Sequence, residues 1–194
     1  LFSYDPLTGV YSKMVDFNGD NGSQPAGSLV AYNGILYGMT LQGGSVSNAG
    51  ASGGILFSYN PSGGVFTKRV EFSAPNGAAP AGSLAVLNGK LFGFTQSGGA
   101  YGAFPGYGVC FTYDPQAQSF RKLWNFGESS GHSPLRRLLD HDGLFYGTTY
   151  RGGIDDQGVL FSFDPGTARY ARLFDFRSET GANPFSALAV YNGL

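Results

Sequence analysis

The sequence has few charged residues, and their signs are nearly balanced. Lysine, arginine, aspartate and glutamate make up 13% of the 194 residues, and the formal net charge is −1. A basic stripe that could neutralise a phosphate backbone is therefore missing, which argues against nucleic acid as a partner. Surface helices usually carry charged outer faces, so helix is not expected over most of the chain.

Long apolar runs, cysteine and histidine are also scarce. The apolar runs are only a few residues long, whereas a membrane-spanning helix needs about 20, so no membrane span is predicted in this chain. The single cysteine, Cys110, stands in a strand pattern where Leu56 and Leu160 hold near-equivalent places, which favours a buried apolar role over a reactive thiol. His132 and His141 belong to no zinc-binding spacing, so no cofactor is predicted.

Glycine is abundant instead, and it marks an internal repeat. An Asn-Gly or Asp-Gly pair recurs at 33–34, 88–89, 142–143 and 192–193, at steps of 55, 54 and 50 residues. An Asp-Pro or Asn-Pro pair keeps the same steps in every unit. Repeats of this length share one core, so a single domain, or a portion of one, is expected over 1–194.

Each unit contains four strand-like runs, which in the second unit lie at 83–87, 90–95, 109–113 and 119–126. Asn-Gly favours a type I′ hairpin turn between the first two strands, and Asp-Pro favours a short turn between the last two. Long Gly-rich loops join the second strand to the third. The pattern predicts an all-β protein, a β-propeller of four-stranded antiparallel blades with about 50–55 residues each.

The predicted blades do not add up to a simple closed ring. Three full blades are expected at about 28–72, 83–126 and 135–176, with a partial blade at 1–17 and the start of a next blade at 186–194. The chain then supplies one strand fewer than a closed four-bladed ring requires. We therefore expect either a ring with further blades or a ring completed by another chain.

The fourth strand of each unit alternates apolar residues with one basic residue at a fixed place. These residues are Lys13, Lys68, Lys122 and Arg172. We expect each aliphatic stem to pack on neighbouring aromatic rings while the charge reaches water or a carboxylate. A ring of functional cations is the alternative.

The motifs of the unit resemble a known family. Leu-Phe-Ser-Tyr-Asp-Pro at 1–6, an Asp-Phe or Glu-Phe pair, Gly-x-x-Pro, and Leu-Phe-Tyr-Gly-Thr-Thr-Tyr-Arg-Gly-Gly at 144–153 follow one another in register. This pattern is similar to the Gloeobacter/Verrucomicrobia-type tandem repeat, a bacterial relative in style of the Kelch repeat. The resemblance implies a propeller in a secreted or surface-anchored bacterial protein, hence an extracellular or cell-surface location. It supplies no catalytic residues.

The two ends of such a propeller differ in character. Because successive antiparallel strands reverse direction, the tight turns of all units share one end, and the Gly-rich loops and the connections between units share the other. We call the latter the long-loop end. Loops on a rigid frame commonly carry binding residues, so function is expected there.

One loop at this end has an unusual composition. Tyr101, Phe104 and Tyr107 lie within the loop at 99–108, whereas its counterpart at 44–54 has no aromatic residue. Such rings can stack on a sugar or anchor a protein partner. The alternative is that they cover the base of their own loop or contact a neighbouring subunit.

Two further groups of polar residues are candidates. Tyr150 and Arg151, beside Asp155 and Asp156, form a second possible ligand-binding patch. The alternation of Asp16, Asn18 and Asp20 resembles the start of a calcium loop, but Asn21 and Gly27 stand where such a loop requires glycine and a bidentate glutamate. An ordinary Asn/Asp-rich turn is favoured there, with metal binding as the alternative.

These features favour a non-enzymatic binding or scaffolding propeller that recognises glycan or protein through its long-loop end. A structural subunit of a larger multi-chain assembly is one alternative. A polysaccharide-acting enzyme with a central pocket is another, since carboxylates from two blades can meet at the centre of a propeller. The fold alone does not choose among these functions.

Overall fold

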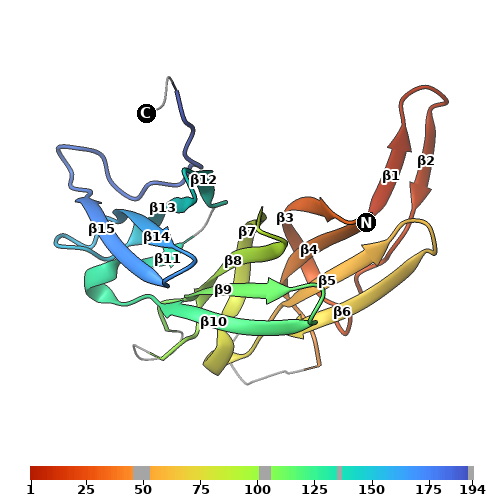
Figure 1. The fold of residues 1–194 in the computed structure, drawn as a ribbon, viewed down its shortest axis with the longest axis horizontal. Coiled ribbons are helices and arrows are strands. Elements are labelled where there is room, and N and C mark those ends of the chain that lie inside the picture. Colours follow the sequence, from red (N-terminus) through yellow and green to blue (C-terminus); the bar gives the residue numbers. More distant parts are fainter. Residues whose placement is uncertain (46–52, 101–105, 135–136, 192–194) are drawn as a thin grey trace.

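The computed structural model describes residues 1–45, 53–100, 106–134 and 137–191, and these are almost entirely strand and loop (Figure 1). The only helical segments in the described ranges are two 3-10 turns, η1 (Ala74–Asn76) and η2 (Glu128–Ser130). The strands are β1 (Phe2–Asp5), β2 (Val10–Lys13), β3 (Ser23–Tyr32), β4 (Ile35–Gln42), β5 (Ile55–Asn60), β6 (Val65–Glu71), β7 (Ala78–Leu87), β8 (Lys90–Ser97), β9 (Val109–Asp114), β10 (Ser119–Asn125), β11 (His132–Pro134), β12 (Leu139–His141), β13 (Leu144–Arg151), β14 (Val159–Asp164) and β15 (Arg169–Asp175).

The strands form antiparallel sheets that follow one another along the chain. Two sheets have the orders β3-β4-β5-β6 and β7-β8-β9-β10, and a third runs from β13 through β14 to β15, with β11 and β12 both paired to β13. β1 and β2 form a separate two-stranded sheet. In Figure 1 the sheets stand side by side along an arc from β1 to β15. The all-β fold with propeller blades is therefore confirmed, and the three larger sheets are called here the first, second and third blades.

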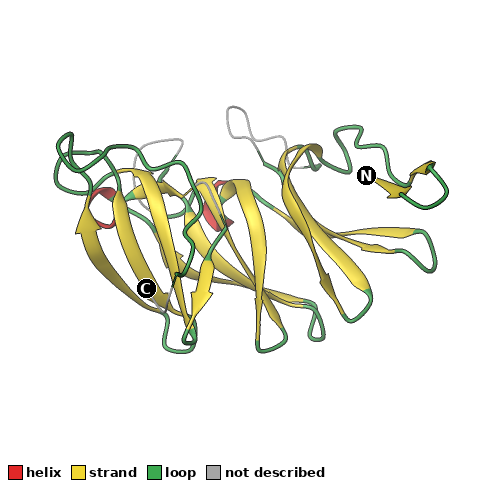
Figure 2. Cartoon of the chain, turned by 90° about the horizontal axis from the view of Figure 1, so that it is seen from above, coloured by secondary structure: helices red, strands yellow, loops and turns green. Residues whose placement is uncertain are grey.

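The hairpin turns follow the geometry that the sequence predicts. Asn88 and Gly89 both have positive φ, 49° and 76°, and the equivalent pairs at 33–34 and 142–143 do the same. Positive φ at both central residues defines the type I′ turn, which matches the twist of the two strands that it joins. These tight turns lie at the lower edge of Figure 2, and the longer loops lie at the upper edge.

The first strand of a blade starts earlier than predicted. β7 begins at Ala78, not at Ser83, and the register with β8 shifts between Ala81 and Ala85. Gly82, with φ of +78°, lies within this bulge and lets the strand continue through it. The third blade follows the same path as two short strands, β11 and β12.

Aromatic side chains fill the space between neighbouring blades. The third strand of each blade points a phenylalanine at the preceding blade, so the Phe111 ring lies 5.1 Å from the Phe72 ring and the Phe161 ring lies 5.6 Å from the Phe126 ring. All four side chains are buried. Cys110 is fully buried in the cluster that contains Phe126 and Phe161, and burial raises the pKa of its thiol, so the predicted apolar role is confirmed.

The faces at the two ends of the array remain open. Phe2 and Tyr4 are 64% and 59% exposed, although their counterparts Phe57 and Tyr59 in the first blade are buried. At the other end Phe174 of β15 is 43% exposed. Residues 186–191 form no regular strand, and 192–194 lie outside the described residues. No described strand pairs the first blade with the third, so the arc is a partial propeller.

The basic residue of the fourth strand links neighbouring units. Lys122 Nζ donates to the carbonyl oxygen of Pro75 at 3.0 Å, and Arg172 Nη1 donates to that of Ser129 at 3.1 Å. Lys68 also contacts a carboxylate, that of Glu71, as expected for a structural cation. The acceptor carbonyls lie in the connections that lead into each blade. These cations therefore belong to the scaffold.

Candidate functional site

A threonine in the second strand of each blade closes the base of the long loop. The Thr95 hydroxyl accepts the Val109 N–H at 3.0 Å and donates to the Ser97 carbonyl at 2.9 Å. Thr40 and Thr149 make the same pair of bonds in the other two blades. A Cβ at Gly108 would lie 2.2 Å from the Thr95 carbonyl oxygen, which requires glycine at that place. The residue before it, Tyr107, is thereby held on a rigid base.

The main chain of Tyr107 is fixed by a bond that the repeat conserves. The Ser133 N–H of the third blade donates to the Tyr107 carbonyl oxygen at 3.2 Å. The corresponding bonds in the other units join Ala79 to Gly53 at 3.0 Å and Asn183 to Gln157 at 2.8 Å. The side chain at this position therefore differs between the units, as Gly53, Tyr107 and Gln157, while the backbone hydrogen bond stays the same.

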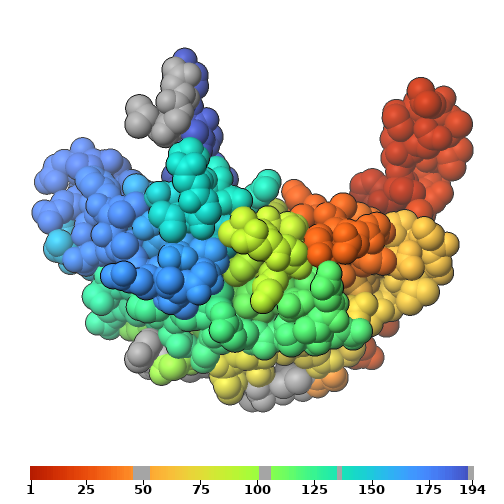
Figure 3. All heavy atoms as spheres, in the orientation of Figure 1, coloured from red at the N-terminus to blue at the C-terminus, as the bar shows by residue number. Residues whose placement is uncertain are grey.

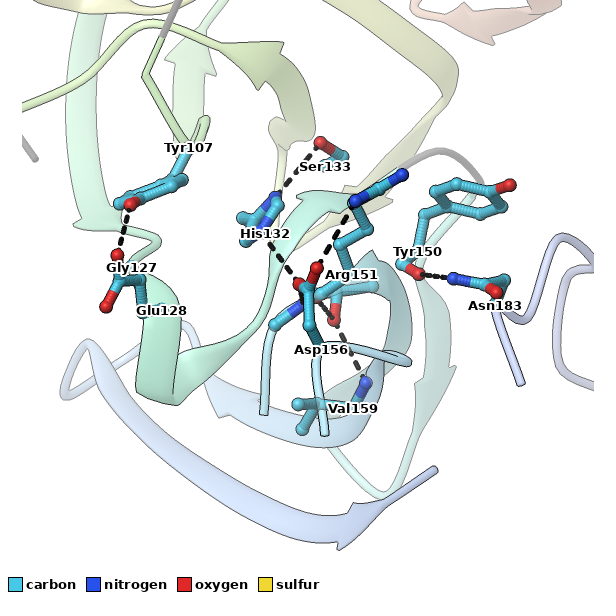
Figure 4. Close-up of polar contacts among 12 residues, drawn as sticks. Tyr107, Gly127, Glu128, His132, Ser133, Tyr150, Arg151, Asp156, Val159 and Asn183 are labelled. Atoms are coloured by element: carbon cyan, nitrogen blue, oxygen red, sulfur yellow. Dashed lines mark hydrogen bonds and ion pairs between the residues drawn. The ribbon is translucent and has the colours of Figure 1, made fainter. Parts of the chain in front are cut away.

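The Tyr107 side chain bridges the second and third blades (Figure 4). Its hydroxyl donates to Glu128 Oε1 at 2.8 Å, and its ring centre lies 4.8 Å from that of His132. The hydrogen bond to Glu128 raises the pKa of the Tyr107 phenol. The phenol is accordingly neutral at ordinary pH and serves as a hydrogen-bond donor.

His132 continues this contact to two charged residues. Its Nε2 lies 3.4 Å from Asp156 Oδ1, and Arg151 Nη1 lies 3.2 Å from Asp156 Oδ2. His132 and Arg151 are cross-strand partners of β11 and β13, which places both side chains on one face of the sheet. Asp156 therefore accepts from both, and Figure 4 shows it between them.

The protonation of this group follows from its surroundings. Burial lowers the pKa of His132, whose side chain is only 17% exposed, and the Asp156 carboxylate opposes that shift. The pKa of Asp156 is lowered, chiefly because its carboxylate accepts the Gly152 N–H at 2.7 Å. Asp156 is therefore ionised at neutral pH and orients His132 and Arg151.

An open depression lies beside Tyr107 at the same end. Its volume is about 720 Å³, and the residues that line it are Tyr107, Leu123, Trp124, Asn125, Gly127, Glu128, Ser129 and Ser130. The Trp124 ring stacks on Tyr170 at 5.1 Å with an interplanar angle of 6°, which fixes its orientation. The lining combines aromatic rings with a carboxylate, an amide and hydroxyl groups, so it can offer both apolar ring contacts and hydrogen bonds.

The predicted ligand-binding residues divide into three groups. Tyr101 and Phe104 lie outside the described residues. Tyr107 and Arg151 are brought into one cluster through His132 and Asp156. Tyr150 is directed elsewhere, because adjacent residues of a strand point to opposite faces, and its ring contacts Phe185 at 6.1 Å.

Sequence reasoning missed His132, Glu128 and Trp124 as members of the site. A comparison of the units contains the signal for His132, since Ser23 and Ala78 stand at the equivalent place in the first and second blades. A residue that departs from its counterparts on a repeated scaffold is free to serve something other than the fold.

The alternative metal candidates take part in a hydrogen-bonded turn. Asn18 Oδ1 accepts the Asn21 N–H at 3.2 Å, and Asn21 Oδ1 accepts the Asn18 N–H at 2.8 Å. The Asp16 carboxylate pairs with Lys13 at 2.8 Å, and the Asp20 carbonyl oxygen accepts from Lys68 at 3.3 Å. Across the described ranges no three His, Cys, Asp or Glu side chains gather as metal ligands.

These observations define the class of protein. The chain is a partial β-propeller whose long-loop end carries an aromatic and charged cluster that spans two blades. Over residues 1–194 it matches the Gloeobacter/Verrucomicrobia repeat, and it belongs to that family. Within the described ranges no helix is both long and apolar enough to cross a bilayer.

Similarity to proteins of known structure is remote. A chain of a nidogen/laminin complex is 13% identical with a TM-score of 0.49, over 76% of this chain and 46% of that chain. YjhT is 14% identical with a TM-score of 0.49, over 82% and 54% of the two chains. TolB from Acinetobacter baumannii is 16% identical with a TM-score of 0.43, over 72% and 29%. This chain spans about half or less of their lengths, and no curated protein matches it.

Proposed function

We propose that this protein is a non-enzymatic binding propeller that recognises glycan at its long-loop end, in a secreted or surface-anchored bacterial protein. The observation that carries the proposal is the depression beside Tyr107, where Trp124, Asn125 and Glu128 also line the wall. An aromatic wall offers apolar contact to the face of a sugar ring. The neighbouring amide and carboxylate offer partners for its hydroxyl groups.

The surrounding contacts favour a preorganised site. The Tyr107 side chain is held by Glu128 and His132, and Trp124 is held by Tyr170. Aromatic groups that are already ordered lose little conformational entropy when a ligand binds. Tyr101 and Phe104 belong to the same loop in the sequence, and we include them in the proposed site. Arg151 extends it to the third blade.

The repeat itself supplies a matched variant for the test. Gln157 occupies the place of Tyr107 in the third blade, on the same backbone hydrogen bond. Tyr107→Gln should therefore leave the melting temperature within a few degrees of the parent while it weakens binding. The measurement is binding to a bacterial and plant polysaccharide array, followed by calorimetric titration of the best hit. Tyr11→Ala, which removes an exposed aromatic residue from β2, is the control.

The possible outcomes separate the candidate functions. Loss of glycan binding in Tyr107→Gln, with binding retained in Tyr11→Ala, supports the proposal. A parent protein that binds no glycan refutes it. Equal binding by Tyr107→Gln and the parent places any glycan site elsewhere. For the loop, Tyr101→Ala combined with Phe104→Ala should abolish binding and spare the fold.

A further inference from the structure

The innermost segment of the third blade departs from the repeat. After the proline of the Gly-x-x-Pro motif, the first and second blades have Gly-Ser-Leu, at 27–29 and 82–84. The third blade has Arg-Arg-Leu at 136–138, and the next unit has Ser-Ala-Leu at 186–188. In the third blade only, two arginines thus replace two small residues.

The small residues of the other blades have a scaffold role. A Cβ at Gly27 would lie 1.9 Å from the Gly82 carbonyl oxygen, and the Ser28 N–H donates to Ser83 Oγ at 2.8 Å. The innermost strands of the first two blades therefore approach closely through these residues. Arg137 stands at the place of Ser28 and Ser83, and among the described residues it makes no such contact, so the scaffold seen there does not account for it.

Arg137 lines a second depression, on the inner side of the arc. Its volume is about 670 Å³, and its polar lining consists of Arg137 with Ser28, Ser83 and Gln96. Phe185 adds an aromatic wall. In Figure 3 the molecule is hollowed on this side, where β3, β7 and β12 face the space between the N-terminal hairpin and the C-terminal segment. The depression is separate from the one at Tyr107, with which it shares no lining residue.

The electrostatics of this depression favour an anion. Arg137 is exposed and has no ion pair or hydrogen bond within the described ranges, and no aspartate or glutamate is among the described residues that line the depression. Arg137 and Asp140 both line a smaller neighbouring depression, but these two described residues form no salt bridge with each other. A guanidinium group supplies a planar pair of donors that matches a carboxylate or phosphate. The two serine hydroxyls and the Gln96 amide can add further donors.

We propose that the inner depression binds a small organic molecule through an oxoanion, either a carboxylate or a phosphate, held by Arg137. Phe185 covers the apolar part of the ligand. Ser28, Ser83 and Gln96 contact its remaining polar groups. The charge that recognises the ligand thus comes from one blade, and the remaining donors come from the other two.

The experiment uses ligands that share a ring and differ in charge. Glucuronate and glucose 6-phosphate are titrated into the protein at low salt, with glucose as the neutral control and inorganic phosphate as the bare anion. The parent should bind at least one of the two organic anions, with little affinity for glucose. Preference for glucuronate or for glucose 6-phosphate identifies the oxoanion. Equal affinity for inorganic phosphate would show an adventitious ion site and overturn the proposal.

Three variants test the role of Arg137. Arg137→Ser restores the residue of the other blades and should weaken binding about tenfold or more, because a charge-assisted hydrogen bond is lost. Arg137→Lys keeps the charge but lacks the planar pair of donors, so its affinity for the organic anion should lie between those of the parent and Arg137→Ser. Arg121→Ser removes the same charge from the exposed face of β10 and should bind like the parent. Unchanged binding in Arg137→Ser, an equal loss in Arg121→Ser, or no binding of either organic anion by the parent overturns the proposal.

This outcome is independent of the site at the long-loop end. Tyr107→Gln should retain the affinity for the organic anion, and Arg137→Ser should retain the affinity for the glycan. Each variant therefore serves as the folding control for the other. Failure of one proposal leaves the other measurable.

Discussion

Lys122 on β10 donates a 3.0 Å hydrogen bond to the carbonyl oxygen of Pro75, which lies in the connection between the first and second blades. Lys68 and Arg172 contact the equivalent carbonyls of Asp20 and Ser129. The same contact therefore recurs at each full blade. It ties the outermost strand to the connection that brings the chain into that blade.

Loss of this contact should weaken the fold measurably. Lys122→Met keeps an aliphatic stem of similar length and removes the bond, so the free energy of unfolding should fall by about 1 kcal/mol. Lys13→Met at the equivalent place removes only an exposed pair with Asp16, which solvent screens, and should cost clearly less than Lys122→Met. Urea unfolding of both variants measures the difference, and equal losses would count against a clamp between units.

Buried threonines offer a second comparison, because two of them differ in whether their hydroxyl has a hydrogen-bond partner. The Thr95 hydroxyl accepts the Val109 N–H, whereas the Thr112 hydroxyl has no hydrogen-bond partner among the described residues. Thr95→Val leaves the buried Val109 N–H without its hydrogen-bond acceptor, so the free energy of unfolding should fall by about 1–3 kcal/mol. Thr112→Val removes a hydroxyl that has no partner and should be neutral or stabilising. Chemical denaturation of both variants provides the measurement. A larger loss in Thr112→Val than in Thr95→Val would refute this account of the loop base.

The open end of the array predicts that the same substitution has different effects on stability in two neighbouring units. Phe57 is 2% exposed and lies between units, whereas Phe2, at the same place in the preceding unit, is 64% exposed. Phe57→Ala should therefore cost about 3–5 kcal/mol, the range for a buried phenylalanine. Phe2→Ala should cost less than about 1 kcal/mol if its face is uncovered in solution. A similar large loss in Phe2→Ala would mean that a further blade or another chain covers that face.

The repeated unit explains how much of the fold the sequence could predict. Asn88-Gly89 favours one turn type, and the recurrence of this pair places the first hairpin of each blade. The recurring Asp-Pro or Asn-Pro pair places the second hairpin, so the strands and the two ends of the propeller follow from local chemistry. The start of β7 could not be predicted, because the bulge at Gly82 lies directly against Gly27 of the adjacent blade, and that contact is visible only in the structure. Contacts between neighbouring units can be identified only from the three-dimensional structure.

The candidate site likewise combines features that are visible in the sequence with features that depend on contacts between strands. The aromatic character of Tyr107 and the charge of Arg151 were visible in the sequence, but their link through His132 and Asp156 depends on the pairing of β11 with β13. Tyr150 was expected beside Arg151, yet strand geometry turns it toward Phe185. Comparison of unlike residues at equivalent places would have found His132 and Arg137 without a structure.

The lowered pKa of His132 makes stability depend on pH. Its ordinary value is 6.5, and burial lowers it in the folded protein, so the unfolded chain takes up a proton first as the pH falls. The stability contributed by the neutral imidazole is complete above pH 6.5 and is lost as the pH falls below it toward the folded pKa. The Asp156 carboxylate, whose pKa is lowered from the ordinary value of 3.8, titrates below this window.

His132→Ala should reduce this pH dependence. Alanine is the residue of the second blade at this place, Ala78, so the backbone is expected to accept it. Urea unfolding between about pH 7.5 and pH 5.5 should show the parent losing stability as the pH falls, and the variant losing less. The comparison is between slopes, because the variant also loses the contact with Tyr107 and starts from a lower stability. Identical slopes would mean that His132 titrates alike in the folded and unfolded chains, and would refute the burial argument.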